Sequence, residues 1–408
     1  MKFSKLSRLF LVSSIGLLVA TLFTACEIQT IDYVFVADSA GSGAGSAGQI
    51  STFAADSESG ALRYGQPSVP SGGINPVALA VTSDYQNLYV ANQGNNSVVH
   101  FAIAGNGVLT QKDLVTTSTK PVSLAVNSAG TYLYVVSGTA SATLTEYSLS
   151  SGTIGAVTSQ AALSVPGYAG DTLIPTSITV LANNATVSGN AIYVTAYDQS
   201  AYNPGGSVTS TANPGWVFGF TVGSGGALTA VSGSPWKAGV KPTAIASDPT
   251  DRFVYVTDYA SNQLIGYTIQ SGSILNFLTN GPFRTGNEPT AIVIDPRGKY
   301  IYVTNSLDST VSAWSIDLST GTPAGTANVT GSPSNTTDTQ PVSLVVDPAL
   351  GRFIYTANHL GNSVSGFRLD PDNGTLTITQ STPYITGDQP TAVVAVPHGN
   401  TSVESVTP

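Results

Sequence analysis

The chain has 408 residues, of which only 9% are charged, and its formal net charge is −9. An acidic surface poor in lysine argues against nucleic acid as a partner, because phosphates require clusters of Lys and Arg, and against electrostatic binding to anionic lipid. With one cysteine no intrachain disulfide can form, and glycine-rich segments between short apolar stretches indicate an all-β protein.

Residues 1–25 have the pattern of a secretory leader. Lys2, Lys5 and Arg8 form its positive end, and residues 9–23 form an apolar run that is short for a stable membrane span. The only cysteine, Cys26, follows directly. Leu22-Phe23-Thr24-Ala25-Cys26 resembles a bacterial lipoprotein leader, in which the cysteine becomes the lipidated N-terminus.

This resemblance implies a protein that is exported and held in the cell envelope through lipidated Cys26, with residues 26–31 as a short tether. Glu27, in place of the Asp that favours inner-membrane retention, favours the outer membrane. The alternative is an ordinary cleaved leader and a free thiol. A tether this short predicts that the bottom of the folded domain lies against the membrane.

Four landmarks recur along the rest of the chain, each of them seven times. The first is a proline before a short apolar strand: Pro76, Pro121, Pro175, Pro242, Pro289, Pro341 and Pro390. The second is an apolar strand with a central aromatic residue: Phe35, Tyr89, Tyr134, Tyr193, Tyr255, Tyr302 and Tyr355. The third is a strand that ends in an aromatic residue: Phe53, Phe101, Tyr147, Phe220, Tyr267, Trp314 and Phe367. The fourth is the glycine of a hairpin: Gly60, Gly107, Gly152, Gly226, Gly272, Gly321 and Gly374.

This repeat predicts one closed seven-bladed β-propeller over residues 32–397, with four antiparallel strands in each blade. The N-terminal copy lacks the first landmark, whereas the C-terminal copy, from Pro390, has nothing after it. Strands from both termini are therefore expected to share one blade and close the ring, which removes exposed sheet edges. Residues 398–408 are expected to form a disordered tail, and the protein is expected to be a monomer.

The residue before each landmark proline should lie at the mouth of the central channel, on the top face of the propeller. Six of these seven residues are polar, which suits a wet funnel: Asn75, Lys120, Ile174, Lys241, Glu288, Gln340 and Gln389. Lys120, Lys241, Glu288, Gln340 and Gln389 are candidate ligand contacts; the alternative is simple solvation of loop ends.

The longest repeat contains an insertion between Tyr197 and Gly215, which is expected to form a flap on the top face and to contribute Asp198 and Tyr202 to ligand binding. Trp236-Lys237 and Phe283-Arg284 are assigned to other top-side connections. Their aromatic rings could orient a sugar, or they could fill gaps between blades.

Several motifs favour a structural role. The spacing of the three histidines suits no metal site, and His100 is expected at the surface. Asp370-Pro371-Asp372-Asn373-Gly374 is interpreted as a hairpin turn rather than a calcium loop. Asp248, Asp295 and Asp347, each followed by proline, are expected to stabilise turns by accepting backbone N–H bonds. No cofactor or metal is predicted.

Ile301-Tyr302-Val303-Thr304-Asn305 resembles the Tyr-Val-Thr-Asn propeller repeat, and the chain from about 32 to 397 is similar to the seven-bladed lactonase family, which includes 6-phosphogluconolactonase-like proteins. That family implies lactone hydrolysis by a His or Arg-His after the landmark proline and a Glu after the Asn of the repeat. Here pairs such as Thr290-Ala291 follow the prolines, and Gln93, Ser306 and His359 follow the Asn.

The sequence therefore favours a lipid-anchored binding module of the lactonase-like family, with a carbohydrate or an envelope protein as the ligand at its top face. The competing hypothesis is a lactone hydrolase of the family type that uses Glu288, Lys241, Lys120 or Arg284 around the funnel.

Overall fold

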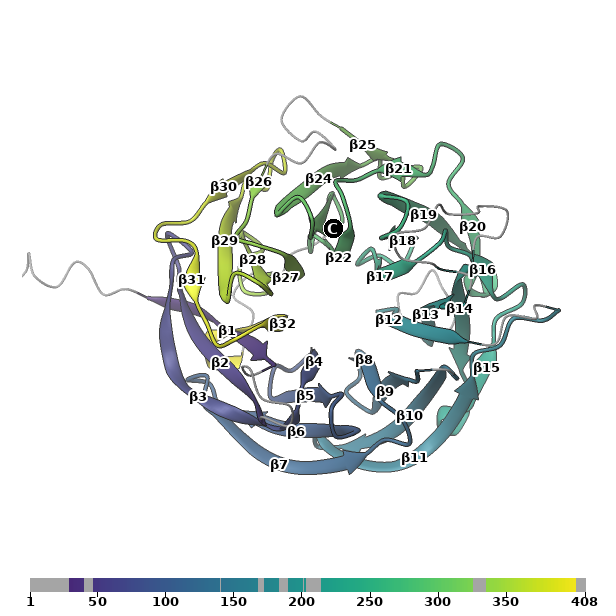
Figure 1. Ribbon diagram of the computed structural model, residues 1–408, viewed down its shortest axis with the longest axis horizontal. Coiled ribbons are helices and arrows are strands. Elements are labelled where there is room, and N and C mark those ends of the chain that lie inside the picture. Colours follow the sequence, from purple (N-terminus) through teal and green to yellow (C-terminus); the bar gives the residue numbers. More distant parts are fainter. Residues whose placement is uncertain are drawn as a thin grey trace, which may run out of the picture.

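Seven antiparallel sheets surround one central axis in the computed structural model, which confirms the predicted propeller (Figure 1). The structure describes residues 29–39, 47–139, 141–167, 172–182, 190–200, 202, 214–325 and 335–400. The leader, Cys26 and residues 401–408 lie outside these ranges. Within them, no helix is long and apolar enough to cross a membrane.

Blades are numbered here from the first complete repeat, and their strands are given from the central axis outward. Blade 1 contains β4 (Pro76–Val81), β5 (Asn87–Asn92), β6 (Ser97–Ile103) and β7 (Leu109–Thr116). Blade 2 contains β8 (Pro121–Val126), β9 (Tyr132–Ser137), β10 (Thr143–Ser150) and β11 (Thr153–Ala162). Blade 3 contains β12 (Leu173–Val180), β13 (Asn190–Asp198), β14 (Gly215–Val222), β15 (Leu228–Ala230) and β16 (Trp236–Lys237).

Blade 4 contains β17 (Pro242–Ser247), β18 (Phe253–Asp258), β19 (Gln263–Gln270), β20 (Ile274–Phe277) and β21 (Phe283–Arg284). Blade 5 contains β22 (Pro289–Ile294), β23 (Tyr300–Asn305), β24 (Thr310–Ile316), β25 (Pro323–Ala324) and β26 (Asn335–Thr336). Blade 6 contains β27 (Pro341–Val346), β28 (Phe353–Asn358), β29 (Ser363–Leu369), β30 (Leu376–Ile378) and β31 (Tyr384–Ile385). Short 3₁₀ turns are η1 (Ser224–Gly226), η2 (Ser271–Ser273) and η3 (His398–Asn400).

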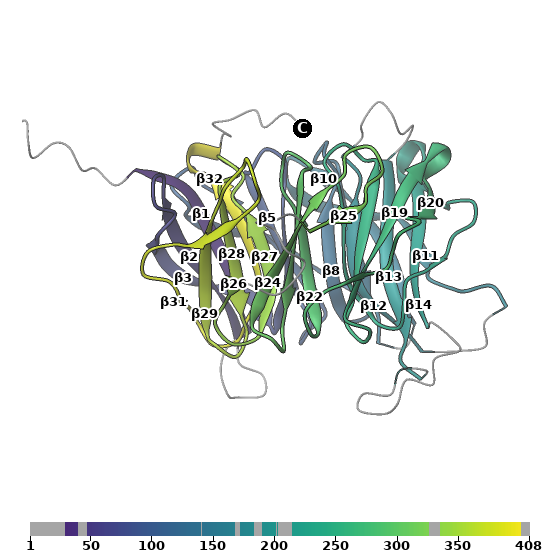
Figure 2. The ribbon, with the colours of Figure 1, turned by 90° about the horizontal axis from the view of Figure 1, so that it is seen from above.

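Blade 7 closes the ring with strands from both ends of the chain, as predicted. Its order is β32 (Pro390–Pro397), β1 (Thr30–Asp38), β2 (Ala47–Asp56) and β3 (Leu62–Ile74). Val36 pairs with Val393 and Val34 with Ala395, and the two strands lie side by side in Figures 1 and 2. After β32 the Gly399 amide donates to the Gly105 carbonyl at 2.9 Å, so η3 contacts blade 1.

Blades 3 to 6 depart from the simple four-strand pattern because the outermost strand is interrupted. In each of these blades two short segments pair with the same third strand, for example β20 and β21 with β19. The outer strand has solvent on one side, so only part of its length must pair. The sheets therefore keep four strand positions, although four of them contain five segments.

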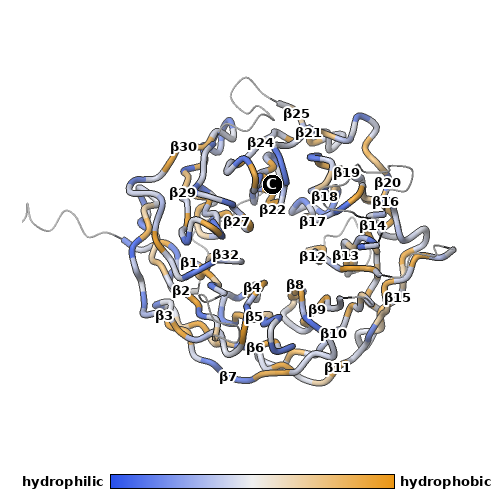
Figure 3. Tube along the Cα trace, in the orientation of Figure 1, coloured by the Kyte–Doolittle hydropathy of each residue, from blue (hydrophilic) through white to orange (hydrophobic). Residues whose placement is uncertain are grey.

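The second strand of each blade is buried along almost its whole length. All six residues of β5, β18, β23 and β28 are buried, because neighbouring blades cover both faces of the sheet. Such strands have continuous apolar sequences, and Figure 3 shows hydrophobic stretches all around the ring. The cores accordingly lie between blades; one cluster joins Tyr355 of blade 6 to Val34 and Val393 of blade 7.

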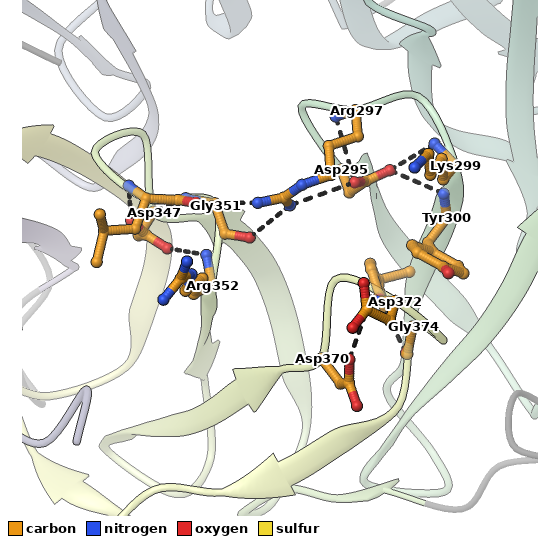
Figure 4. Close-up of polar contacts among 12 residues, drawn as sticks. Asp295, Arg297, Lys299, Tyr300, Asp347, Gly351, Arg352, Asp370, Asp372 and Gly374 are labelled. Atoms are coloured by element: carbon orange, nitrogen blue, oxygen red, sulfur yellow. Dashed lines mark hydrogen bonds and ion pairs between the residues drawn. The ribbon is translucent and has the colours of Figure 1, made fainter. Parts of the chain in front are cut away.

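The predicted turn motifs are confirmed on the bottom face. Asp295 accepts hydrogen bonds from the Lys299 and Tyr300 amides at 2.6 and 2.8 Å (Figure 4), and Asp248 and Asp347 do the same in their blades. In the hairpin at 370–374, the Asp370 carboxylate accepts the Asp372 amide at 2.9 Å.

The expectation that His100 lies at the surface is wrong. Its side chain is 2% exposed, with Nδ1 2.8 Å from Asp113 Oδ2 and Nε2 2.9 Å from Asn87 Oδ1. His100 occupies the third-strand position that faces a tyrosine of the second strand, and its ring stacks on Tyr89.

Candidate functional site

A repeated backbone contact builds the top face around the channel. The residue after the second strand donates its N–H to the carbonyl of the residue before the landmark proline. In blade 4 Tyr259 donates to Lys241 at 2.9 Å, and in blade 5 Ser306 donates to Glu288 at 2.9 Å. The same bond joins Gln93 to Asn75, Gly138 to Lys120, His359 to Gln340 and Ser39 to Gln389. Each blade that has this bond, except blade 2 with its Gly138, therefore presents two neighbouring side chains at the mouth.

Four of the residues before the prolines have a left-handed backbone, namely Asn75, Glu288, Gln340 and Gln389, with φ between 53° and 59°. This conformation is unfavourable for side chains other than Gly and Asn, so surrounding contacts must hold it. For Glu288 such a contact comes from Asn262, whose Oδ1 accepts the Glu288 amide at 2.8 Å. The carboxylate is thereby fixed at the boundary between blades 4 and 5.

Lys241 lies among three tyrosine rings. Its Nζ is 4.1 Å from the ring centroid of Tyr259, 4.9 Å from that of Tyr202 and 5.8 Å from that of Tyr197. Tyr197 and Tyr202 come from blade 3 and its top loop, whereas Lys241 and Tyr259 belong to blade 4. Cation–π attraction stabilises the ammonium in this position.

Glu288 completes the cluster from the adjacent loop. Its carboxylate lies near the Tyr259 hydroxyl, and the Ser306 Oγ donates to its Oε2 at 3.4 Å. Burial lowers the pKa of the Lys241 ammonium, although the Glu288 carboxylate partly opposes this effect. Burial also raises the pKa of the Tyr259 hydroxyl, and the nearby Glu288 carboxylate raises it further.

The four groups provide complementary chemistry at one place. Glu288 can accept a proton, Lys241 can stabilise a developing negative charge, and Tyr259 and Ser306 carry hydroxyls that can donate hydrogen bonds. Lys241, Glu288, Tyr202, Tyr259 and Ser306 are named the Lys241–Glu288 cluster below. Ser306 is buried, but the other four side chains are half-buried at the mouth of the channel, so a ligand could contact them.

Two buried aspartates support the loops of this cluster. Asp258 Oδ1 accepts the Lys241 amide at 2.9 Å and Oδ2 accepts the Val240 amide at 3.0 Å, which fixes the backbone of Lys241. Asp198, a predicted ligand contact, is 1% exposed and accepts the Ser200 amide and hydroxyl. The structure gives Asp198 the position of a loop cap. Residues 201 and 203–213 of the expected flap lie outside the described residues.

Other predicted residues lie apart from the cluster. Lys120 is exposed at the mouth, but in blade 2, which blade 3 separates from blade 4. Gln340 and Gln389 lie at the mouth in front of β27 and β32. Trp236 and Arg284 lie on the outer segments β16 and β21 rather than at the channel, and Trp236 packs against Tyr193, 6.3 Å between ring centroids.

The repeat pattern did not indicate Tyr197, Tyr259 and Ser306 as site residues. A signal for Tyr259 was present, because it follows Asp258 just as Gln93, Ser306 and His359 follow the Asn of their repeats. Its proximity to Glu288 depends on contact between blades, which the spacing within one repeat does not contain. Across the described residues, no group of three or more His, Cys, Asp or Glu side chains could hold a metal ion.

Comparison with known proteins places this geometry in context. A family model described as "Lactonase, 7-bladed beta-propeller" matches residues 47–169 and 230–401. None of the curated protein sequences matches the chain.

Among solved structures, a periplasmic gluconolactonase of Pseudomonas aeruginosa is similar with a TM-score of 0.70 and 16% identity, over 90% of this chain and 99% of that one. A Bacteroides fragilis protein provisionally described as a 6-phosphogluconolactonase has a TM-score of 0.69 and 17% identity, over 91% and 99% of the two chains. A Lactobacillus plantarum protein has a TM-score of 0.71 and 16% identity, over 90% and 100%. At these identities the structural likeness shows the fold alone.

Proposed function

Because the chain belongs to the lactonase family of seven-bladed β-propellers, we propose that it hydrolyses lactones at the Lys241–Glu288 cluster. The observation that carries this proposal is the meeting of the Glu288 carboxylate, the Lys241 ammonium group and the phenols of Tyr259 and Tyr202, which come from the loops of three consecutive blades. Fold alone would not support it, because one fold hosts many functions.

In the proposed reaction the Glu288 carboxylate takes a proton from a water molecule, and the water oxygen bonds to the lactone carbonyl carbon. The Lys241 ammonium stabilises the negative charge that develops on the carbonyl oxygen. The bond between the carbonyl carbon and the ring oxygen then breaks, and the ring oxygen receives the proton from Glu288. The product is a hydroxy acid, which releases one proton to solvent.

A sugar lactone is the substrate class that the cluster suits best. Tyr197, Tyr202 and Tyr259 supply aromatic surface for a pyranose or furanose ring, and their hydroxyls can bond to sugar hydroxyls. The names of the similar structures from P. aeruginosa and B. fragilis refer to lactones of this kind.

The proposed site departs from the positions that the sequence resemblance implied. Thr243 and Thr290 follow the relevant prolines, and each Oγ1 donates to the proline carbonyl of the next blade at 2.8 Å. In these two blades the residue after the proline therefore links the inner strand of its own blade to the inner strand of the next blade by a hydrogen bond. The reactive groups would instead come from the residues before the prolines, Lys241 and Glu288.

A second candidate function is sugar binding without hydrolysis, as the sequence analysis first favoured. The three tyrosine rings around Lys241 support it, since aromatic rings hold sugars equally well in a binding module. For either function we propose an exported protein anchored in the envelope through Cys26, supported by the leader pattern and the lone cysteine.

The proposal is tested by measuring whether the full-length protein hydrolyses glucono-δ-lactone. Proton release at pH 6.5 reports the reaction, and the spontaneous rate is subtracted. We expect Glu288→Gln to lower kcat by about 100-fold or more, the usual loss for a general base, while sugar binding persists. Glu58→Gln makes the same chemical change on an exposed bottom hairpin and should leave kcat unchanged. Binding without hydrolysis by the unaltered protein would select the second candidate.

A further inference from the structure

The same hydrogen bond occurs at the interruption of two outer strands. In blade 3 the amide of Gly219, which pairs with Tyr193, donates to the Ser234 hydroxyl at 2.9 Å. In blade 6 the amide of Gly366 donates to the Thr382 hydroxyl at 2.9 Å. Each of these hydroxyl residues directly precedes a proline in the interrupted part of the outer strand. Its hydroxyl therefore accepts the glycine amide, which has no outer-strand carbonyl opposite it.

Blade 4 has the same arrangement without the hydroxyl. Gly266 pairs with Tyr255, just as Gly219 pairs with Tyr193 in blade 3. Gly281, which precedes Pro282, occupies the position of Ser234 in blade 3 and of Thr382 in blade 6. The Gly266 carbonyl accepts the Leu278 amide at 2.9 Å, so the amide of Gly266 faces the same outer side. Among the described residues it has no hydrogen-bond partner on that side.

A pocket of about 210 Å³ opens at this position on the outer side of blade 4. Gly266 and Gly281 line it together with the apolar side chains of Ile265, Phe277 and Leu278. Phe277 is 54% exposed and packs on Tyr267 with 4.9 Å between ring centroids. Buried amides are almost always paired, so an open donor beside an apolar wall indicates a ligand that carries both an acceptor and a hydrophobic body.

The charge of the lining favours an anionic acceptor. Lys237 is the ionisable residue among the lining residues, and its Nζ lies 4.9 Å from the Trp216 ring centroid. Asp258 lies behind the pocket wall, where it accepts hydrogen bonds from the Val240 and Lys241 amides and from the Gln263 side chain. Its charge is thus directed to those donors rather than into the pocket.

We propose that this pocket, separate from the Lys241–Glu288 cluster, binds small monocarboxylates with an aromatic or branched apolar body. The carboxylate accepts the Gly266 amide near Lys237, and the apolar body lies against Phe277 and Leu278. A volume of about 210 Å³ accommodates a single ring, since engineered cavities of about 150 Å³ bind benzene.

Benzoate titrated into the full-length protein by isothermal titration calorimetry at constant ionic strength tests the proposal. We expect a Kd of about 1 mM, the range for a ligand of this size. Gly281→Ser supplies the hydroxyl that blades 3 and 6 already have, so it should fold normally and weaken benzoate binding at least about tenfold. Benzamide, which has the same shape but no charge, should bind at least about fivefold more weakly than benzoate to the unaltered protein.

Gly281→Ala is the matched control, because it adds the same carbon atom without the hydroxyl. It should bind benzoate within about threefold of the unaltered protein. No benzoate binding by the unaltered protein, or equal loss in the Ala and Ser variants, would overturn the proposal. Equal binding of benzamide and benzoate would overturn the choice of a carboxylate. Melting curves of both variants establish that each is folded, and lactone hydrolysis should be unaffected.

Discussion

Five tyrosines of the second strands connect neighbouring blades through single hydrogen bonds. Tyr255 of blade 4 donates to the Gly321 carbonyl in the hairpin of blade 5 at 2.6 Å, and Tyr302 donates to Gly374 in blade 6 at 2.8 Å. Tyr89, Tyr193 and Tyr355 make the corresponding bonds to Gly152, Ser273 and Gly60. The hairpin glycines also need their left-handed φ and missing side chain; a Cβ on Gly321 would lie 2.3 Å from the Phe253 ring.

The sequence showed both partners of these bonds but not the bonds themselves. The tyrosine and the glycine were recognised as separate landmarks of one repeat, yet the contact joins consecutive blades. Blades 2 and 7 break the rule: Phe35 has no hydroxyl, and the buried hydroxyl of Tyr134 has no hydrogen-bond partner among the described residues. A repeat pattern predicts which residue types recur, whereas the pairing between copies requires the ring geometry.

Removing one of these hydroxyls should cost measurable stability. Tyr255→Phe keeps the ring but leaves the buried Gly321 carbonyl without its donor, so we expect the free energy of unfolding to fall by about 1–2 kcal/mol. Urea unfolding followed by far-UV circular dichroism measures the change. Tyr64→Phe removes a hydroxyl that donates to Ile385 on an exposed side chain, and should change stability by less than about 0.5 kcal/mol. Equal effects of the two substitutions would contradict the argument.

At the scale of elements, the turns between first and second strands are organised by one buried carboxylate each. Asp295 is 0% exposed, accepts three backbone amides of its own turn and lies 3.7 Å from the Arg297 guanidinium. Arg297 in turn donates to the Leu350 and Gly351 carbonyls of blade 6 (Figure 4). One side chain therefore fixes a turn and, through Arg297, a contact between blades.

Asp295→Ala should be among the more destabilising single substitutions on the bottom face. It leaves buried amides without an acceptor and removes the carboxylate that faces Arg297, so we expect a loss of about 3 kcal/mol. Asp317→Ala is the matched comparison, because Asp317 also accepts two turn amides but is exposed, and a clearly smaller loss of stability is expected. Denaturant midpoints of the two variants measure the two losses of stability. A smaller loss for Asp295→Ala than for Asp317→Ala would show that burial of the carboxylate does not determine the loss.

The sequence predicted these turns, but not the interrupted outer strands or the approach of Tyr197 and Tyr259 to Lys241. An Asp followed by Pro favours a turn through local hydrogen bonds, whatever the surrounding fold. An outer strand has one free edge, so its sequence is weakly constrained and a break such as that at Gly281 leaves little periodic signal. The landmark prolines lie on the inner strands as predicted, whereas Tyr197 and Tyr202 reach Lys241 only because blade 3 lies beside blade 4.

For the whole molecule, the closing blade depends on a strand with a buried carboxyl near each end. Asp32 lies near the start of β1, where burial, followed by the nearby Asp347 carboxylate, raises its pKa well above the ordinary value. Asp38 lies at the end of β1, where burial raises its pKa to about 6 although the Ser51 and Thr386 hydroxyls donate to it at 2.6 and 2.9 Å. Ring closure and protonation are therefore linked.

The sign of this linkage follows from the raised pKa of Asp38. A carboxyl that holds its proton more tightly when folded stabilises the protein fully below its unfolded pKa of 3.8, and this contribution is lost as the pH rises through about 6. The shift corresponds to about 3 kcal/mol at most. Asp38→Asn cannot titrate, so the free energy of unfolding of the unaltered protein, relative to this variant, should decline by up to that amount between pH 4 and pH 7.5. Urea unfolding at four or five pH values measures both curves, and parallel curves would show that Asp38 does not couple closure to pH.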